Sequence, residues 1–159
     1  MIENLTWELT PPYGFYFRVS FFQMATGNLF ITSFSEVTGL GWSAESDKKK
    51  DSEGKVQEME SGMKCNRIRL KSPLQPLPSL FETWVNGHFD RMAATHGKAC
   101  IDAYDMVVSL QNRLNFPTAV WLCSHVYPVS LSIEGISAAS SQLTTEEVVL
   151  ACNRIERKL

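Results

Sequence analysis

Few side chains in this sequence have the types and spacing that chemistry requires, and the three histidines illustrate this. His88, His96 and His125 fall on three different predicted elements, and none belongs to a pair that would orient a metal ligand. A histidine that stands alone in this way is far more often structural than catalytic. The sequence therefore predicts no metal site and no catalytic histidine.

Carboxylates occur in two close pairs that could in principle supply an acid and a base. Glu146 and Glu147 are neighbours in a predicted strand, so their side chains point to opposite faces and cannot share a substrate. Glu58 and Glu60 would share a face, but acidic residues on an exposed strand are usually solvated or ion-paired. Neither a Gly-x-Ser-x-Gly motif nor a glycine-rich phosphate loop is present. We therefore expect no enzyme, no catalytic residue and no cofactor.

The four cysteines give no sign of a metal or redox motif. Cys65, Cys100, Cys123 and Cys152 lie far apart and never form a Cys-x-x-Cys pair. We interpret them as small core or surface residues, with one disulfide left open as an alternative.

Residues 1–8 carry acids where a signal peptide needs a basic start, and no apolar run is long enough to span a bilayer. We expect synthesis and residence in the cytosol, without direct membrane insertion.

Composition is typical of one ordinary globular domain spanning residues 1–159. The chain is 44% hydrophobic and 20% charged, with a formal net charge of -2. Basic residues are interleaved with acids, as in residues 47–51, instead of being concentrated on one face. This pattern argues against nucleic acid binding.

The elements that position these residues are mostly strands. Residues 15–22 alternate between apolar and polar, and a Gly-Asn turn leads to a second strand at residues 29–37. In residues 65–71, Ile68 and Leu70 should face inward. Further strands are expected at residues 101–111, at residues 119–133 with a break or bend at Pro128, and at residues 143–153, the last covered on both faces.

One helix is expected after the proline-rich residues 72–78. Ser79 and Glu82 have the spacing of a capping box, and Gly97 is the expected end. An apolar stripe should pack on the sheet while Glu82, Asn86 and Asp90 stay in water. The stripe comprises Leu80, Phe81, Trp84, Val85, His88, Phe89 and Met92. The predicted fold is therefore mainly β, an antiparallel barrel or sandwich with one packed helix.

A charged segment interrupts this pattern at about residues 45–62. Residues 45–54 contain no apolar residue and cannot form a core of their own. We expect an exposed charged loop or hairpin tip, followed by a return strand at residues 55–61. A solvated loop and a loop that contacts another subunit are about equally compatible with this composition.

Several short motifs occur in an order that resembles the phage tail tube-like protein family, which forms the inner tube of contractile injection systems and is related to type VI secretion tube proteins. The motifs are residues 11–19 (PPYGFYFRV), 34–40 (FSEVTGL), 62–71 (GMKCNRIRLK), 80–84 (LFETW), 119–121 (AVW), 126–129 (VYPV) and 145–150 (TEEVVL). Together they span nearly the whole chain.

This resemblance implies a non-enzymatic subunit of stacked, hexameric rings inside a contractile sheath. Its implied partners are copies of itself and the sheath, baseplate or spike proteins of the same particle. The resemblance implies assembly in the bacterial cytoplasm, and the finished particle could be cytoplasmic, membrane-anchored or released. Residues 45–61 depart from the family pattern in the region that contacts the neighbouring ring. Both a trunk subunit and a ring that initiates the tube at the baseplate are therefore compatible with the sequence.

Charged residues near this segment are the candidate inter-subunit contacts. Opposite charges could fix the register between rings more than they add affinity. The candidates are Asp47, Lys48, Lys49, Lys50, Asp51, Glu53, Lys55, Glu58, Glu60, Arg67, Arg69 and Lys71. A competing hypothesis is a small-ligand β-barrel or an enzyme on such a barrel, which requires an enclosed apolar cavity with convergent polar groups.

Overall fold

A computed structural model of the chain describes residues 15–50, 52–73, 80–96, 102–135 and 144–159. The elements are β1 (Phe15–Gln23), β2 (Asn28–Phe34), β3 (Glu36–Thr38), β4 (Trp42–Lys50), β5 (Val56–Cys65), β6 (Ile68–Pro73), α2 (Leu80–Ala94), β7 (Tyr104–Asn112), β8 (Pro117–Glu134), β9 (Thr145–Ala151) and β10 (Arg154–Arg157). Every strand pair among them is antiparallel.

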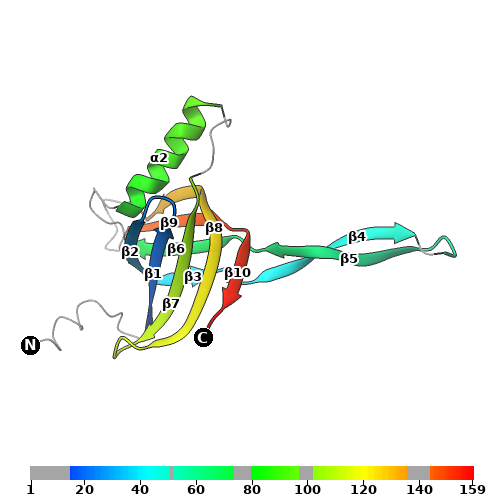
Figure 1. Ribbon diagram of the computed structural model, residues 1–159, viewed down its shortest axis with the longest axis horizontal. Coiled ribbons are helices and arrows are strands. Elements are labelled where there is room, and N and C mark those ends of the chain that lie inside the picture. Colours follow the sequence, from blue (N-terminus) through cyan, green and yellow to red (C-terminus); the bar gives the residue numbers. More distant parts are fainter. Residues whose placement is uncertain (1–14, 51, 74–79, 97–101, 136–143) are drawn as a thin grey trace, which may run out of the picture.

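Eight of the described strands form one curved sheet in the order β2-β1-β7-β8-β9-β6-β3, with β10 paired to β8 (Figure 1). The predicted mainly β fold with one packed helix is confirmed for this part of the chain. Of the two forms predicted, a barrel or a sandwich, the described residues show no closed barrel, because no ladder joins the end strands β2 and β3. The chain turns at Ser35, whose backbone N–H donates to the Lys71 carbonyl at 2.9 Å, and β3 then pairs with β6.

Alternation of residue type explains which side of the sheet is buried. Val19 and Phe21 on β1 and Ile68 and Leu70 on β6 are fully buried, as their spacing predicts. An aromatic cluster fills the space between the sheet and α2. Its members are Phe21, Phe30, Phe34, Phe81, Trp84 and Tyr104. Side chains therefore occupy the concave side that a ligand-binding barrel would leave open.

Helix α2 follows the predicted stripe except in its first turn. Phe81, Trp84 and Val85 are buried as expected, but Leu80 is 67% exposed and Glu82 only 6% exposed. The predicted solvent exposure of Glu82 is wrong because its carboxyl group faces Glu146 of β9. The helix ends at Ala94, and the residues predicted to cap its two ends, 79 and 97, lie outside the described residues.

Three strand predictions need correction in detail. Residues 29–37 form two strands, β2 and β3, because the second leaves β1 to pair with β6. Residues 119–133 lie within one strand of 18 residues, β8, so the strand does not break at Pro128, but its register shifts between Pro128 and Ser130, where the break or bend was expected. Strand β10 was not predicted, since four residues are too few for a clear alternation.

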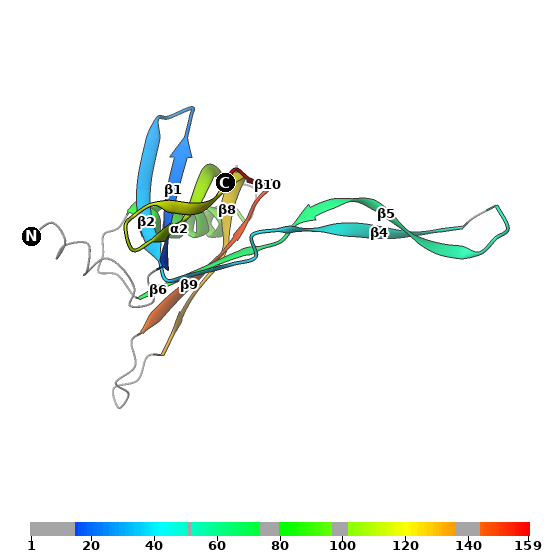
Figure 2. The same cartoon turned by 90° about the horizontal axis from the view of Figure 1, so that it is seen from below.

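The expected charged loop lies in a two-stranded ribbon formed by β4 and β5. The strands pair from Trp42 with Cys65 to Lys50 with Val56, and the ribbon projects far beyond the sheet (Figures 1 and 2). Gly39 lies just before the ribbon with φ of 86°, and a Cβ atom there would collide with the Arg67 carbonyl oxygen. Only glycine allows this close approach, which fixes where the ribbon leaves the sheet.

Candidate assembly surface

The base of the ribbon has one apolar face. Trp42 is paired with Cys65 and Ala44 with Met63, so these four side chains share a face. Cys65 packs against the core, whereas Trp42 is 49% exposed and Met63 is also exposed. A two-stranded ribbon has little stability alone, and exposed large apolar side chains in a row often mark a contact surface. This face is therefore suited to cover, or be covered by, another molecule.

Most of the predicted contact residues lie on the ribbon. The backbone register places Lys48 opposite Glu58, Ser46 opposite Glu60 and Asp47 opposite Met59. Lys50 and Lys55 lie at the far end, where both are exposed together with Glu53, and Lys49 lies opposite Gln57. Asp51 lies outside the described residues. The backbone register thus places residues of opposite charge, Lys48 and Glu58, at paired positions, which the sequence could not specify without that register.

The remaining predicted contact residues lie at the other end of the ribbon, on β6 and the residues before it. Arg69 Nη1 lies 2.7 Å from Glu147 Oε1, and Lys71 Nζ lies 3.7 Å from Glu147 Oε2. Arg67 is exposed beside Gly39. Arg69 and Lys71 are therefore partly neutralised within the chain, and an inter-subunit role for them would add to this ion-pair cluster.

A buried pair of carboxyl groups lies under β2, and the sequence analysis did not find it. Glu82 and Glu146 are 6% and 4% exposed, and they line a cavity of about 290 Å³ together with Ser72 and residues of β2. Burial, a hydrogen bond with Glu82 and the charge of Glu82 raise the pKa of Glu146 to about 7. The alternation of β9 could have revealed Glu146, because it shares the inward face of Val148 and Leu150.

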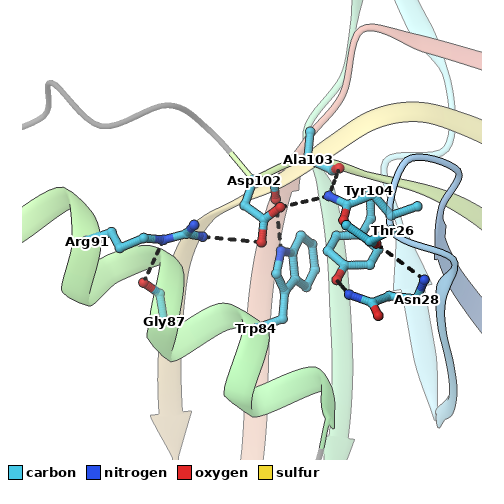
Figure 3. A network of polar contacts seen from close by, with 9 residues as sticks. Thr26, Asn28, Trp84, Gly87, Arg91, Asp102, Ala103 and Tyr104 are labelled. Atoms are coloured by element: carbon cyan, nitrogen blue, oxygen red, sulfur yellow. Dashed lines mark hydrogen bonds and ion pairs between the residues drawn. The ribbon is translucent and has the colours of Figure 1, made fainter.

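A polar network fastens α2 to the neighbouring strands (Figure 3). Arg91 Nη2 lies 3.3 Å from Asp102 Oδ2, and the Trp84 indole N–H donates to the Asp102 carbonyl at 2.9 Å. Gln23 Nε2 donates to the other Asp102 carboxylate oxygen at 2.7 Å. These contacts hold Asp102 from two sides, so we assign it a structural role in attaching α2 to the sheet.

The histidines lie apart, as their sequence positions indicate. His88 is buried against Phe89, and burial, with a smaller contribution from the Arg91 charge, lowers its pKa. His125 is exposed, and its backbone N–H donates to Asp105 Oδ1 at 3.1 Å. His96 follows the end of α2. Within the described ranges, no group of three or more His, Cys, Asp or Glu residues could hold a metal ion.

Three cysteines are free thiols in or beside the core, and the fourth, at position 100, lies outside the described residues. Burial, followed by the charges of Cys152 and Cys65, raises the pKa of Cys123 to about 12. Burial and the neighbouring Cys65 raise the pKa of Cys152 to about 12. Thiols with such pKa values are poor nucleophiles at neutral pH.

None of the described helices combines the length and apolar character needed to cross a membrane.

An open β-sheet with an aromatic-filled concave side, one helix and a projecting ribbon defines a structural subunit that assembles through its surface. The sequence profile of the family described as T4-like virus tail tube protein gp19 matches residues 13–156. The chain therefore belongs to this family, and the predicted family resemblance is confirmed. No curated protein matches the chain in sequence.

Solved structures of similar fold include chains of the anti-feeding prophage and of an extracellular contractile injection system. A chain in the anti-feeding prophage (AFP) baseplate has a TM-score of 0.69 at 20% identity, with 94% of this chain and 96% of that chain covered. A chain in the sheath–tube complex of the extracellular contractile injection system PVC has a TM-score of 0.65 at 20% identity, with 99% and 97% covered. A chain of the PVC sheath/tube terminator has a TM-score of 0.67 at 22% identity, with 94% and 96% covered.

Proposed function

We propose that the chain is a non-enzymatic subunit of the inner tube of a contractile injection system or phage tail, and that it forms stacked, hexameric rings. Membership of the tail tube family supports this proposal. The projecting β4–β5 ribbon is the single observation that carries it. A two-stranded ribbon alone is only marginally stable, so contact with a neighbouring copy would stabilise it. Its partners are copies of itself and, at the ends or outside of the tube, sheath, baseplate or spike proteins.

The competing ligand-binding barrel is not favoured. Three cavities in the described part of the chain lie beside α2, under β2 and near the β1–β2 turn, and aromatic rings pack between α2 and the sheet. A trunk subunit and a ring that initiates the tube both fit the proposal. Chains of similar fold occur in a baseplate structure and in a sheath–tube complex, and both are compatible with the proposal.

Shortening the ribbon tests the proposal. Glu45 and Gly62 are paired, so replacing residues 46–61 by Asn-Gly should join them through a two-residue hairpin turn. We expect a folded protein, because the eight-stranded sheet is left unchanged, but an assembly that no longer grows into tubes. Circular dichroism checks the fold, and negative-stain electron microscopy checks the tubes.

The substitution Ser52→Ala at the exposed far end of the ribbon is the control, and it should assemble like the wild type. Tubes of wild-type length from the shortened variant would contradict a role of the ribbon in assembly. Loss of the native circular dichroism spectrum would instead mean that the ribbon is part of the folding unit.

A further inference from the structure

The two ends of the sheet carry different exposed groups. Strands β1 and β7 pair from Phe22 with Asp105 at one end to Phe15 with Asn112 at the other. These pairs are seven residues apart along β1, which corresponds to about 24 Å at 3.4 Å per residue. The β7–β8 turn lies at one end, and the β1–β2 turn lies at the other, on the side of α2 (Figure 1).

The β7–β8 turn presents two large apolar side chains. Leu114 is 74% exposed and Phe116 is 63% exposed. The turn is nevertheless well ordered by hydrogen bonds, since Asn112 Oδ1 accepts from the backbone N–H groups of Leu114 at 2.9 Å and Phe116 at 3.1 Å. The Tyr16 hydroxyl donates to Asn115 Oδ1 at 2.6 Å. A turn whose backbone is ordered in this way loses little backbone entropy on binding, which suits a docking element.

The opposite end of the sheet has a pocket of about 180 Å³, which would hold roughly six waters and so has room for one leucine-sized side chain. Its lining residues are Phe22, Gln23, Met24, Ala103, Asp105 and His125. Charges at the two ends are opposite, because Arg113 lies in the β7–β8 turn and Asp105 lines the pocket. Opposite charges favour contact between unlike ends over contact between like ends.

We propose that the β7–β8 turn of one copy docks onto the pocket at the opposite end of the next copy, with Leu114 entering the pocket and Arg113 facing Asp105. The inference rests on the proposed function and specifies which surfaces stack. Because the two surfaces differ, the contact is heterologous and repeats from copy to copy along the strand direction. Stacking then buries Leu114, Phe116 and Met24, which a single copy leaves exposed.

A cysteine pair tests the contact directly. Met24→Cys combined with Leu114→Cys places one thiol at each end, too far apart within a copy for the Cα separation of about 7 Å or less that a disulfide needs. Assembled protein is oxidised by copper phenanthroline and air, which accept the two electrons as two thiols become a disulfide. We expect a ladder of dimers, trimers and longer species on a non-reducing gel, which a thiol reductant collapses.

The single variants Met24→Cys and Leu114→Cys are the controls, and neither should give a ladder. Dimers from Leu114→Cys alone would indicate contact between like ends and overturn the inference. Tubes without a ladder from the double variant would overturn it as well, because another surface or another partner would then occupy these ends.

A double variant separates this inference from the proposed function. Arg113→Glu with Leu114→Ser should leave separate rings but raise the concentration needed for tubes by about tenfold or more, as expected for loss of an interface anchor. Tubes that form at the wild-type concentration would overturn the inference alone. A wild-type protein that forms neither rings nor tubes would overturn the proposed function, and the inference would fall with it.

Discussion

Replacing Trp84 by alanine is expected to lower the free energy of unfolding by about 3–5 kcal/mol, as for other large aromatic residues in cores. Trp84 is 7% exposed, and its ring centroid lies 5.3 Å from that of Phe21 and 5.2 Å from that of Tyr104. The truncation leaves a cavity in the aromatic cluster. It also removes the indole donor from the Asp102 carbonyl.

Denaturant unfolding, followed by circular dichroism, measures this effect. Trp42→Ala is the matched control, because Trp42 is 49% exposed on the ribbon and its loss should change the stability of a single copy by less than about 1 kcal/mol. Equal stability of the Trp84→Ala variant and the wild type would contradict the packing of α2 on the sheet.

The second large effect is a pH dependence of stability that comes from Glu146. Its pKa is raised from 4.5 to about 7, chiefly by burial and then by the hydrogen bond and charge of Glu82. Between these two pH values, the folded state keeps a proton that the unfolded state has lost. Stability should therefore fall as pH rises from about 4.5 to about 7 and then level off, with a total change of about 3 kcal/mol.

The substitution Glu146→Gln should remove this slope, because a neutral amide keeps a hydrogen-bonding group beside Glu82 without titrating. Glu82 and Glu146 are the two ionisable residues that line the cavity, and Glu147 and Lys71 lie on the opposite faces of their strands. The pKa of His88 is lowered from 6.5, so this residue makes stability rise with pH below about pH 6.5, the opposite of the Glu146 effect. The difference between variant and wild type cancels that contribution.

Thermal unfolding measured from pH 5 to pH 8 checks this prediction. Glu36→Gln on the exposed face of β3 is the control and should keep the wild-type pH dependence. Parallel curves for Glu146→Gln and the wild type would show that the two carboxyl groups do not share a proton in the folded protein.

Local patterns were sufficient to predict most of the elements. The alternation in β1, β6 and β9 and the helical stripe of α2 each report which side of one element is buried, so the strands and the helix could be located. The partner of a strand is a long-range property. Nothing in residues 34–40 indicates that β3 pairs with β6 instead of continuing the hairpin of β1 and β2, and for this reason the open sheet was not predicted.

The ends of elements and the buried polar groups were also predicted less well. Glu82 stands next to Phe81 at the edge of the apolar stripe, where a small rotation of the helix decides between water and the core. Its burial depends on a protonatable partner on β9, which is 64 positions later in the chain as counted from the printed sequence. A helical pattern considered alone does not contain that information.

The candidate contact surface shows the same division between composition and register. Composition identified the charged residues of the ribbon, but only the pairing of β4 with β5 places Lys48 opposite Glu58. The apolar face with Trp42 and Met63 was missed, because its residues lie outside the charged segment. Met63 lies two residues from Cys65 and Trp42 two residues from Leu40, both of which pack against the core, and this alternation could have indicated the face.

Negative-stain electron microscopy of the purified full chain at high concentration tests the central claim most directly. We predict hollow rings that stack into tubes, since the ribbon and the two unlike ends of the sheet all require neighbouring copies. A uniform population of single copies, with no rings at any concentration, would contradict the account.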